Sequence, residues 1–212
     1  MWEKEYKKRG FYWKLKPSEG LKEAIKYALK GIALDIGAGE GRNSIFLAKN
    51  GFKVEAIDKN SYGLKKCKEL AKKYNLKIST KTRDITKFNF PYNKYSLVIS
   101  IATIDFLKKS EIEKIVRKTK KSLIKNGVIY FEVFSKNDPL FKKFKKLKLK
   151  LVEKNTFYVP REKFYRHFFT KNEIKELFKD FKIIKLKEKR ILDKSHNNPH
   201  LHNIIMLIAK NY

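Results

Sequence analysis

The stretch LDIGAGEGRNSIFLA, residues 34–48, decides the fold class of this 212-residue chain. An apolar strand end comes first, glycines follow at positions 37, 39 and 41, and helical spacing begins directly after them. Glycines at the turn between a strand and a helix let a ligand approach the backbone closely. This stretch therefore predicts a strand, a ligand-binding turn and a helix.

Strand-like and helix-like segments alternate on both sides of this turn. The apolar patterns predict strands at 31–36, 52–58, 77–83, 95–101 and 128–134, and helices at 23–30, 41–50, 61–75 and 110–125. Ser110, with Glu113 three residues later, has the pattern of a capping box at the start of the last helix. This order predicts an α/β fold, doubly wound, with a mostly parallel seven-stranded sheet and helices on both faces.

The regular alternation of strand and helix patterns ends after residue 134. We expect one domain over residues 1–212 in which residues 138–166 are an insertion, and long insertions often form lids or binding loops. Thr170 and Glu173 form a second capping-box pattern, which predicts a helix to about Asp180. Strand patterns at 181–192 and 201–210, joined by the polar turn SHNNPH, predict a C-terminal antiparallel hairpin.

Composition narrows the class of protein. An apolar content of 42% is ordinary for a globular chain, and no apolar run approaches the roughly 20 residues of a membrane span. The single cysteine, Cys67, excludes an intramolecular disulfide and a CxxC metal site. The charged N-terminal residues do not resemble a secretory signal. We expect a cytoplasmic protein without a membrane span.

The net charge of +30 attracts polyanions and raises the question of a nucleic-acid partner. The basic residues are 45 lysines and only 7 arginines, and they are spread along the whole chain. Arginine binds bases and phosphates through two parallel hydrogen bonds, whereas lysine is a general solvating charge. The charge therefore permits a nucleic-acid partner without favouring one.

The glycine pattern excludes two common nucleotide-binding loops. A P-loop requires GxxxxGK[ST], and a dinucleotide fingerprint requires GxGxxG, whose third glycine is replaced here by Arg42. The pattern is DxGxGxG, with Asp35 before the glycines and Asp58 at the end of the next strand. Asp58 can accept hydrogen bonds from both hydroxyls of a ribose, whereas Asp35 would repel a pyrophosphate and attract a cationic amino-acid group. These features favour S-adenosylmethionine, a cationic ribonucleoside without phosphate, as the cofactor.

Residues 34–60, LDIGAGEGRNSIFLAKNGFKVEAIDKN, resemble class I S-adenosylmethionine-dependent methyltransferases and, more narrowly, the tellurite-resistance methyltransferase family. The specific run is GRNS after the glycines, then xxLA, then GFxVxAxDKN. Ala38 departs from the cysteine that this family often has there. The resemblance implies a Rossmann-like methyltransferase fold, in which the C-terminal hairpin supplies a last antiparallel strand.

The resemblance also implies how the cofactor is held. The glycine turn and Asp35 would contact the methionine part, and Asp58 the ribose, with Lys59 or Asn60 beside the adenine. After the third predicted strand, the side chain of Asp84 would meet the adenine amino group and Ile85 would stack on the ring. The predicted cofactor contacts are Trp13, Asp35, Gly37, Gly39, Gly41, Asn43, Asp58, Lys59, Asp84, Ile85 and Ser100.

Aromatic residues near the N-terminus have two interpretations. The segment Trp13–Pro17 matches a Trp-x-x-x-Pro run that covers the cofactor in the resembled family, so Trp13 and Tyr12 are lid candidates. The same rings could equally pack an N-terminal helix on the core. Both interpretations stay open at the level of sequence.

Motifs that the chain lacks exclude some classes of methyl acceptor. The segment VISIATIDFL contains no [DN]PP[YFW] motif, which enzymes that methylate the amino groups of adenine or cytosine carry. Cys67 lies in a predicted surface helix and is better read as a small hydrophobe than as a nucleophile. Methyl transfer requires a dry pocket that aligns two partners, and a base only if the acceptor carries a proton. We predict a small-molecule acceptor with a soft nucleophile, such as a chalcogen oxyanion or a thiol.

Three of the four histidines lie in SHNNPHLHN, residues 195–203. Two of them, His200 and His202, are two apart on a predicted strand and so face the same side. Asp193 or His167 could complete a metal site, but spacing fixes no further ligand, and we assign no metal. A plain polar turn is another reading. The resemblance implies a third, in which the hairpin contacts the acceptor; the predicted acceptor-site residues are then His196, His202, Arg166 and His167.

Two alternatives concern RNA. The chain could be an RNA methyltransferase that docks its substrate on the lysine-rich segment 141–154, or an RNA-binding module that keeps the fold without turnover. The sequence does not predict an oligomeric state.

Overall fold

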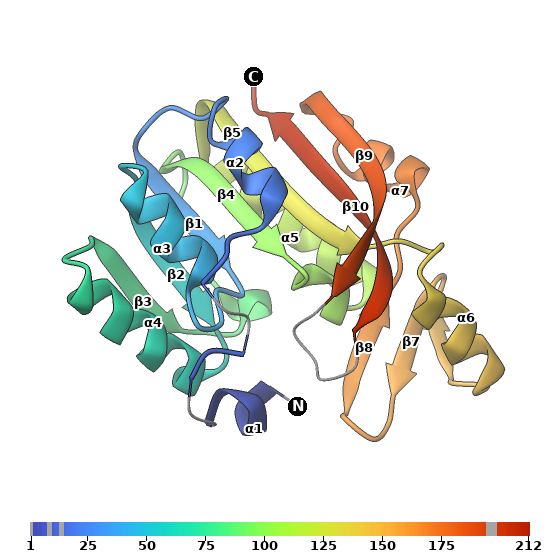
Figure 1. Ribbon diagram of the computed structural model, residues 1–212. Coiled ribbons are helices and arrows are strands. Elements are labelled where there is room, and N and C mark those ends of the chain that lie inside the picture. The colour runs from blue at the N-terminus through green and yellow to red at the C-terminus, as the bar shows by residue number, and fades with distance from the viewer. Residues whose placement is uncertain (1, 8–9, 13–14, 194–198) are drawn as a thin grey trace.

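A seven-stranded sheet forms the centre of the structure, a computed structural model that describes residues 2–7, 10–12, 15–193 and 199–212 (Figure 1). The strand order is β3-β2-β1-β4-β5-β10-β9, and β10 runs antiparallel to both of its neighbours while the other pairs are parallel. The predicted doubly wound fold with a C-terminal hairpin is confirmed. The strands are β1 (Ile32–Ile36), β2 (Lys53–Asp58), β3 (Ile78–Thr82), β4 (Tyr95–Ile101), β5 (Leu123–Phe134), β9 (Lys182–Asp193) and β10 (His200–Lys210).

Helices cover both faces of this sheet (Figure 1). Leu21 and Leu47 belong to the core on the face covered by α2 and α3, whereas Ile115 and Ile174 belong to the core under α5 and α7. Among the described residues, no helix is long and apolar enough to cross a bilayer. The α-helices are α1 (Trp2–Lys7), α2 (Glu19–Ala24), α3 (Arg42–Lys49), α4 (Ser61–Lys73), α5 (Lys109–Ser122), α6 (Pro139–Lys146) and α7 (Lys171–Leu177).

The central strands are buried on both faces, which explains their continuous apolar sequences. In β4, six of seven residues are buried, and β1 and β5 lie on either side of it. Because parallel strands end at the same edge of a sheet, the loops after β1, β2, β4 and β5 gather there. Two 3-10 helices, η1 (Ile85–Lys87) and η2 (Ile104–Phe106), follow β3 and β4 at this edge.

Two predicted helix starts are wrong. The helix predicted at 23–30 is α2, which begins at Glu19 and ends at Ala24, because Tyr27 and Leu29 beyond it are exposed and bury no apolar face. The helix assigned to a cap at Ser110 begins at Lys109 instead. Glu111, not Glu113, occupies the capping position, and its carboxylate accepts the backbone N–H of Lys108 at 3.0 Å.

The segment 138–166 has regular structure of its own. It contains α6 and nearly all of a three-stranded antiparallel sheet of β6 (Leu151–Glu153), β7 (Thr156–Val159) and β8 (Phe164–His167), whose last residue lies one position beyond it. Rings of Phe141, Phe144 and Phe157 pack with Phe168 in a separate small core. The segment lies next to the C-terminal end of β5 and to β10 (Figure 1).

The second predicted capping box is half formed. The Thr170 side chain accepts the N–H of Glu173 at 3.1 Å and caps α7. The Glu173 carboxylate instead lies 3.1 Å from Nε2 of His167, and α7 ends at Leu177, three residues before the predicted end.

Alanine substitutions at two glycines should distinguish the cost of a steric clash from the cost of a positive φ angle. Gly41 and Gly51 both have φ +86°, but a Cβ at Gly41 would lie 2.3 Å from the Cys67 Sγ, whereas a Cβ at Gly51 meets only Lys30 at 3.9 Å. We expect Gly41→Ala to lower the free energy of unfolding by about 3 kcal/mol and Gly51→Ala by about 1 kcal/mol. Urea denaturation of both variants measures this difference, and equal losses would contradict it.

Candidate active site

A cavity of about 1860 Å³ opens at the C-terminal edge of the parallel strands. Cavities that hold one small ligand usually measure about 300–1000 Å³, so this one has room for a cofactor and a second molecule. Its wall runs from the loops after β1, β2 and β3, past the end of β5, to β8 and the β9–β10 hairpin.

The glycine turn forms one end of the cavity wall. Gly37 and Gly39 line the cavity with φ +74° and +54°. A Cβ at Gly37 would lie 2.2 Å from Oγ1 of Thr103, and one at Gly39 would lie 2.7 Å from the Tyr6 hydroxyl. The turn therefore requires glycine for its own packing as well as for ligand approach. Gly41 does not line the cavity, because it packs against Cys67.

Asp58 stands at the end of β2, directly beside the glycine turn. Its Oδ2 accepts the Gly39 N–H at 2.9 Å and its Oδ1 accepts the Asn60 N–H at 2.8 Å. Burial raises the pKa of this carboxyl, and the two backbone donors oppose that shift. Each oxygen has a second lone pair that remains available to a hydroxyl in the cavity.

The predicted adenine end lies next to Asp58. Lys59, Asn60, Asp84 and Ile85 all line the cavity. Asp84 caps η1 through its Oδ1, which accepts the backbone N–H of Thr86 at 2.8 Å. The fold thus brings these four predicted residues, from the loops after β2 and β3, to one end of the cavity.

Asp35 lies behind the glycine turn and does not line the cavity. It is only 2% exposed, and its Oδ2 accepts a hydrogen bond from Oγ of Ser44 at 2.6 Å. Burial raises the pKa of Asp35 to about 7, the Ser44 hydrogen bond opposes this, and the Asp58 charge adds to it.

The raised pKa of Asp35 predicts that the free energy of unfolding depends on pH. A pKa of about 7 in the folded chain against an ordinary 3.8 stabilises the fold at low pH, and this contribution is lost as the pH rises toward 7. Relative to wild type, Asp35→Asn should therefore gain more than about 1 kcal/mol between pH 4 and 8. Urea midpoints across this range measure the gain, with the exposed Asp180→Asn as control. A pH-independent difference would contradict the assignment.

The floor of the cavity contains an acid that the sequence interpretation missed. Glu132 lies on β5, is 8% exposed, and accepts hydrogen bonds from the hydroxyls of Ser18 and Tyr130. Asn43, a predicted cofactor contact, lies nearby and accepts the Ser18 N–H at 3.0 Å. The signal was present, because Glu132 is the one charged residue in the apolar run VIYFEVF.

Arg166 and Asp105 form a buried ion pair at the opposite end of the cavity. Nη1 of Arg166 donates to Oδ2 of Asp105, and the two residues are 6% and 0% exposed. The guanidinium carbon lies 3.8 Å from the ring centroid of Phe106 and 4.7 Å from that of Phe134. Burial raises the pKa of Asp105 and lowers that of Arg166, and each charge opposes the shift of the other. Nε of Arg166 has no hydrogen-bond partner among the described residues.

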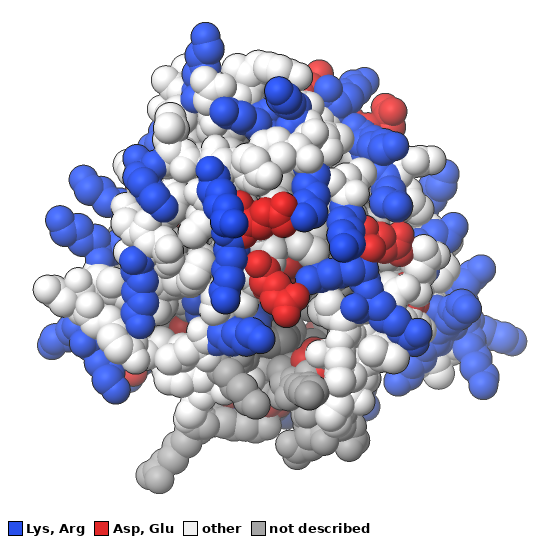
Figure 2. Space-filling model, turned by 45° about the horizontal axis from the view of Figure 1, so that its top comes forward, with Lys and Arg blue, Asp and Glu red and all other residues white. Residues whose placement is uncertain are grey.

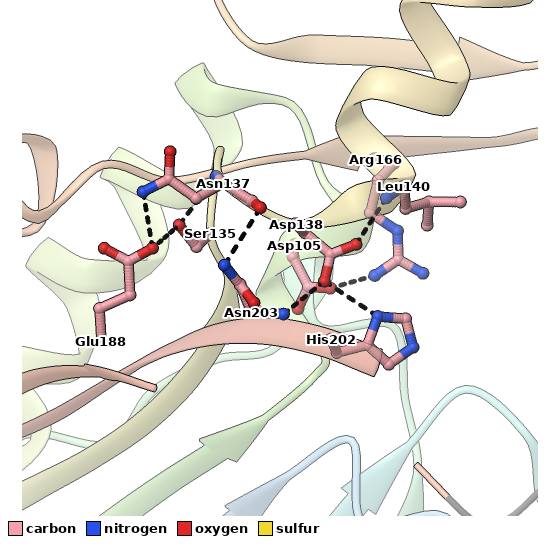
Figure 3. Close-up of polar contacts among 9 residues, drawn as sticks. All are labelled: Asp105, Ser135, Asn137, Asp138, Leu140, Arg166, Glu188, His202 and Asn203. Atoms are coloured by element: carbon pink, nitrogen blue, oxygen red, sulfur yellow. Dashed lines mark hydrogen bonds and ion pairs between the residues drawn. The ribbon is translucent and has the colours of Figure 1, made fainter. Parts of the chain in front are cut away.

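His202 lines the cavity close to this ion pair. Its Nδ1 lies 2.9 Å from Oδ2 of Asp138, a fully buried residue that precedes α6 (Figure 3). Asp138, Asp193 and His200 also line the cavity, and the ligand atoms of Asp193, His200 and His202 lie within 4.8 Å of one another. Asp138 and Asp105 were not predicted, since nothing in the sequence pairs them with β8 or β10.

Some predicted site residues lie elsewhere. His167 is fully buried between Thr156, whose hydroxyl is 2.7 Å from Nδ1, and Glu173, so it does not reach the cavity. Ser100 is buried within β4 and does not line the cavity either. Trp13 and His196 fall outside the described residues. The N-terminal cover that the structure does describe is α1, whose Trp2 and Tyr6 line the cavity.

Comparison with known proteins assigns the family. Residues 3–136 match the family model described as "Tellurite resistance protein TehB". The chain belongs to the TehB family. The resemblance inferred from residues 34–60 is therefore confirmed.

Individual relatives agree with the TehB family assignment. A Haemophilus influenzae protein named "Probable S-adenosyl-L-methionine-dependent methyltransferase TehB" is 28% identical over 155 residues, which are 73% of this chain and 47% of the relative. The chain thus spans about half the length of the curated relatives it matches.

Solved structures share the fold. The crystal structure of TehB from Haemophilus influenzae has a TM-score of 0.73 at 21% identity and covers 100% of this chain and 66% of that one. A Methanosarcina mazei S-adenosylmethionine-dependent methyltransferase has a TM-score of 0.72 at 22% identity, covering 88% of this chain and 95% of that one.

Proposed function

We propose that this chain is an S-adenosylmethionine-dependent methyltransferase whose acceptor is a small molecule with a soft nucleophile, such as a thiol or a chalcogen oxyanion. TehB family membership supports the activity and the cofactor. The observation that carries the proposal is that one cavity contains both the Asp58 end and the Arg166–His202 end, with volume for two molecules.

The cofactor would occupy the Asp58 end. The second lone pairs of the Asp58 carboxylate accept the ribose hydroxyls, and Asp84 and Ile85 meet the adenine. The methionine part then extends along the glycine turn toward Asn43 and Glu132, where the Glu132 carboxylate offers a counter-charge for its ammonium group. Bound in this way, the cofactor supplies the electrophilic methyl group.

The acceptor would occupy the Arg166–His202 end. Arg166 lines the cavity, its guanidinium has more donors than the one that Asp105 accepts, and the rings of Phe106 and Phe134 hold it rigidly, so it can fix an anionic group of the acceptor. The rings also keep water from the reacting atoms, which strengthens electrostatic contacts and aligns the two partners.

The distribution of charge supports a small acceptor over RNA. Figure 2 shows lysines and arginines over the whole of one face, with acidic residues between them, and not as a single basic patch. Lys81 and Lys120 have acidic partners in Glu55 and Asp180, whereas the lysines of α6 form no ion pair among the described residues. An RNA-binding surface would instead gather unpaired cations along a track that follows the phosphates.

Transfer of labelled methyl groups tests this proposal. The chain is incubated with S-[methyl-³H]adenosylmethionine and separate probes, namely dithiothreitol, selenite, tellurite and total RNA, and S-adenosylhomocysteine is quantified. We expect turnover with at least one small probe that does not decline steeply with salt. Turnover with RNA alone, weakened strongly by salt, would overturn the proposed acceptor class.

A further inference from the structure

We propose that Asp138 is a positioning residue that holds His202 as the general base of this site, so that the acceptor is one whose attacking atom carries a proton. Among the candidate acceptors this selects a thiol over a chalcogen oxyanion, which attacks through a chalcogen lone pair that carries no proton. The inference rests on the proposed function and narrows its substrate class.

The Asp138 carboxylate is fixed by three donors (Figure 3). Its Oδ1 accepts the Leu140 N–H at 2.8 Å and caps α6, while its Oδ2 accepts the Asn203 N–H at 2.8 Å and faces Nδ1 of His202 at 2.9 Å. The residue is 0% exposed, so these bonds form out of water. A carboxylate with three directed donors, from α6 and from β10, cannot rotate away from the imidazole without losing a helix cap.

This contact fixes the imidazole tautomer. An ionised carboxylate oxygen can only accept, so Nδ1 of His202 must carry the proton and donate it. In the neutral ring, Nε2 then has the free lone pair. The ring plane is also held, because the Phe134 and His200 rings contact it edge-on with centroids 4.7 Å and 4.6 Å away. A base whose orientation is set by a third group is a recurrent arrangement for activating nucleophiles.

The proposed step is a proton transfer to His202 coupled to a displacement at the methyl carbon. Nε2 of His202 takes the proton from the S–H of the acceptor, and the sulfur lone pair forms a bond to the methyl carbon of S-adenosylmethionine. The bond from that carbon to the sulfonium sulfur breaks, and its electron pair stays on S-adenosylhomocysteine. The imidazolium that forms is stabilised by the Asp138 carboxylate, and its proton leaves to solvent.

The groups around His202 offer one competing use of Nε2. His200 on β10 and Asp193 on β9 could join it in binding a divalent metal ion, since their ligand atoms lie within 4.8 Å. Arg190 of β9 and Lys143 of α6 line the same cavity and oppose a divalent cation, whereas Arg166 and Lys189 are paired with Asp105 and Glu19. We therefore favour the base, and metal binding becomes an outcome of the test.

The tautomer can be measured without any acceptor. Long-range ¹H–¹⁵N spectra of ¹⁵N-histidine protein at about pH 8.5, above the ordinary imidazole pKa, distinguish the two neutral tautomers, and His202→Gln assigns the signal. Asp138→Asn keeps a good helix-capping side chain while removing the charge. We expect the Nδ1–H tautomer in wild type and its loss in Asp138→Asn. An Nε2–H tautomer in wild type, or a stoichiometric shift of Nε2 on adding ZnCl₂, would overturn the inference.

Activity provides the second readout. With dithiothreitol as acceptor, His202→Gln should lower kcat by about 100-fold and Asp138→Asn by at least about 10-fold. With selenite, both substitutions should lower kcat much less than with dithiothreitol, because no proton is removed from the attacking atom. Equal losses with both probes would indicate a merely structural role, and unchanged kcat with dithiothreitol would exclude the base. Asp180→Asn is the control, and S-adenosylhomocysteine affinity, measured by calorimetry, shows separately whether the proposed function itself fails.

Discussion

Replacing Asp58 by alanine is expected to weaken the binding of S-adenosylmethionine and S-adenosylhomocysteine by at least about 100-fold. Two hydrogen bonds from ribose hydroxyls to a charged acceptor are each worth about 1.5–3 kcal/mol, and 1.4 kcal/mol is tenfold in affinity. The substitution also releases the Gly39 and Asn60 N–H groups that shape the turn. Titration calorimetry measures the loss.

Glu55 supplies the matched control for Asp58. It lies three residues earlier on β2, faces away from the cavity, and pairs with Lys94. Glu55→Ala should keep cofactor affinity within a factor of about two, since its carboxylate bonds Lys94 and Tyr95 and does not line the cavity. Asp58→Asn retains an acceptor for one of the two backbone donors and so disturbs the turn less than alanine does. Equal affinities for Asp58→Ala and wild type would contradict the proposed ribose contact.

Arg166→Met is expected to lower the free energy of unfolding by about 3–5 kcal/mol. The substitution leaves Asp105 buried without its counter-charge, and breaking one side of a buried pair costs this much. Burial already raises the pKa of Asp105, so the variant should lose further stability as the pH rises and that carboxyl ionises. Urea denaturation at several pH values measures both effects.

Two further variants make the Arg166 result specific. Adding Asp105→Asn to Arg166→Met should recover most of the lost stability, because no buried charge then remains. Arg161→Met, at an exposed arginine five residues earlier, should change stability by less than about 0.5 kcal/mol. A single substitution at Arg166 as mild as that at Arg161 would contradict a buried ion pair.

The fold and the cofactor end could be predicted because their signals are local. Residues 34–60 contain the strand, the glycine turn, the next helix and Asp58 in one continuous run, and the βαβ order places the strand ends at a common edge. The starts of α2 and α5 were predicted less accurately, because they depend on which apolar side chains pack against other elements in the folded chain.

The acceptor end could not be predicted in the same way. Only tertiary structure brings together the four residues of this end, which are Asp105 of η2, Asp138 just before α6, Arg166 of β8 and His202 of β10. His167 follows Arg166 directly, yet alternation along β8 turns it away from the cavity toward Thr156. Proximity in sequence therefore does not show which of two adjacent residues lines the cavity.

The most direct test of the central claim is titration calorimetry of the wild-type chain with S-adenosylmethionine, S-adenosylhomocysteine and NAD⁺. We predict one-site, micromolar binding of the first two ligands and no detectable binding of NAD⁺, because Arg42 replaces the third glycine that a dinucleotide fingerprint requires. Absence of binding by both S-adenosyl ligands, or tighter binding of NAD⁺, would contradict this prediction.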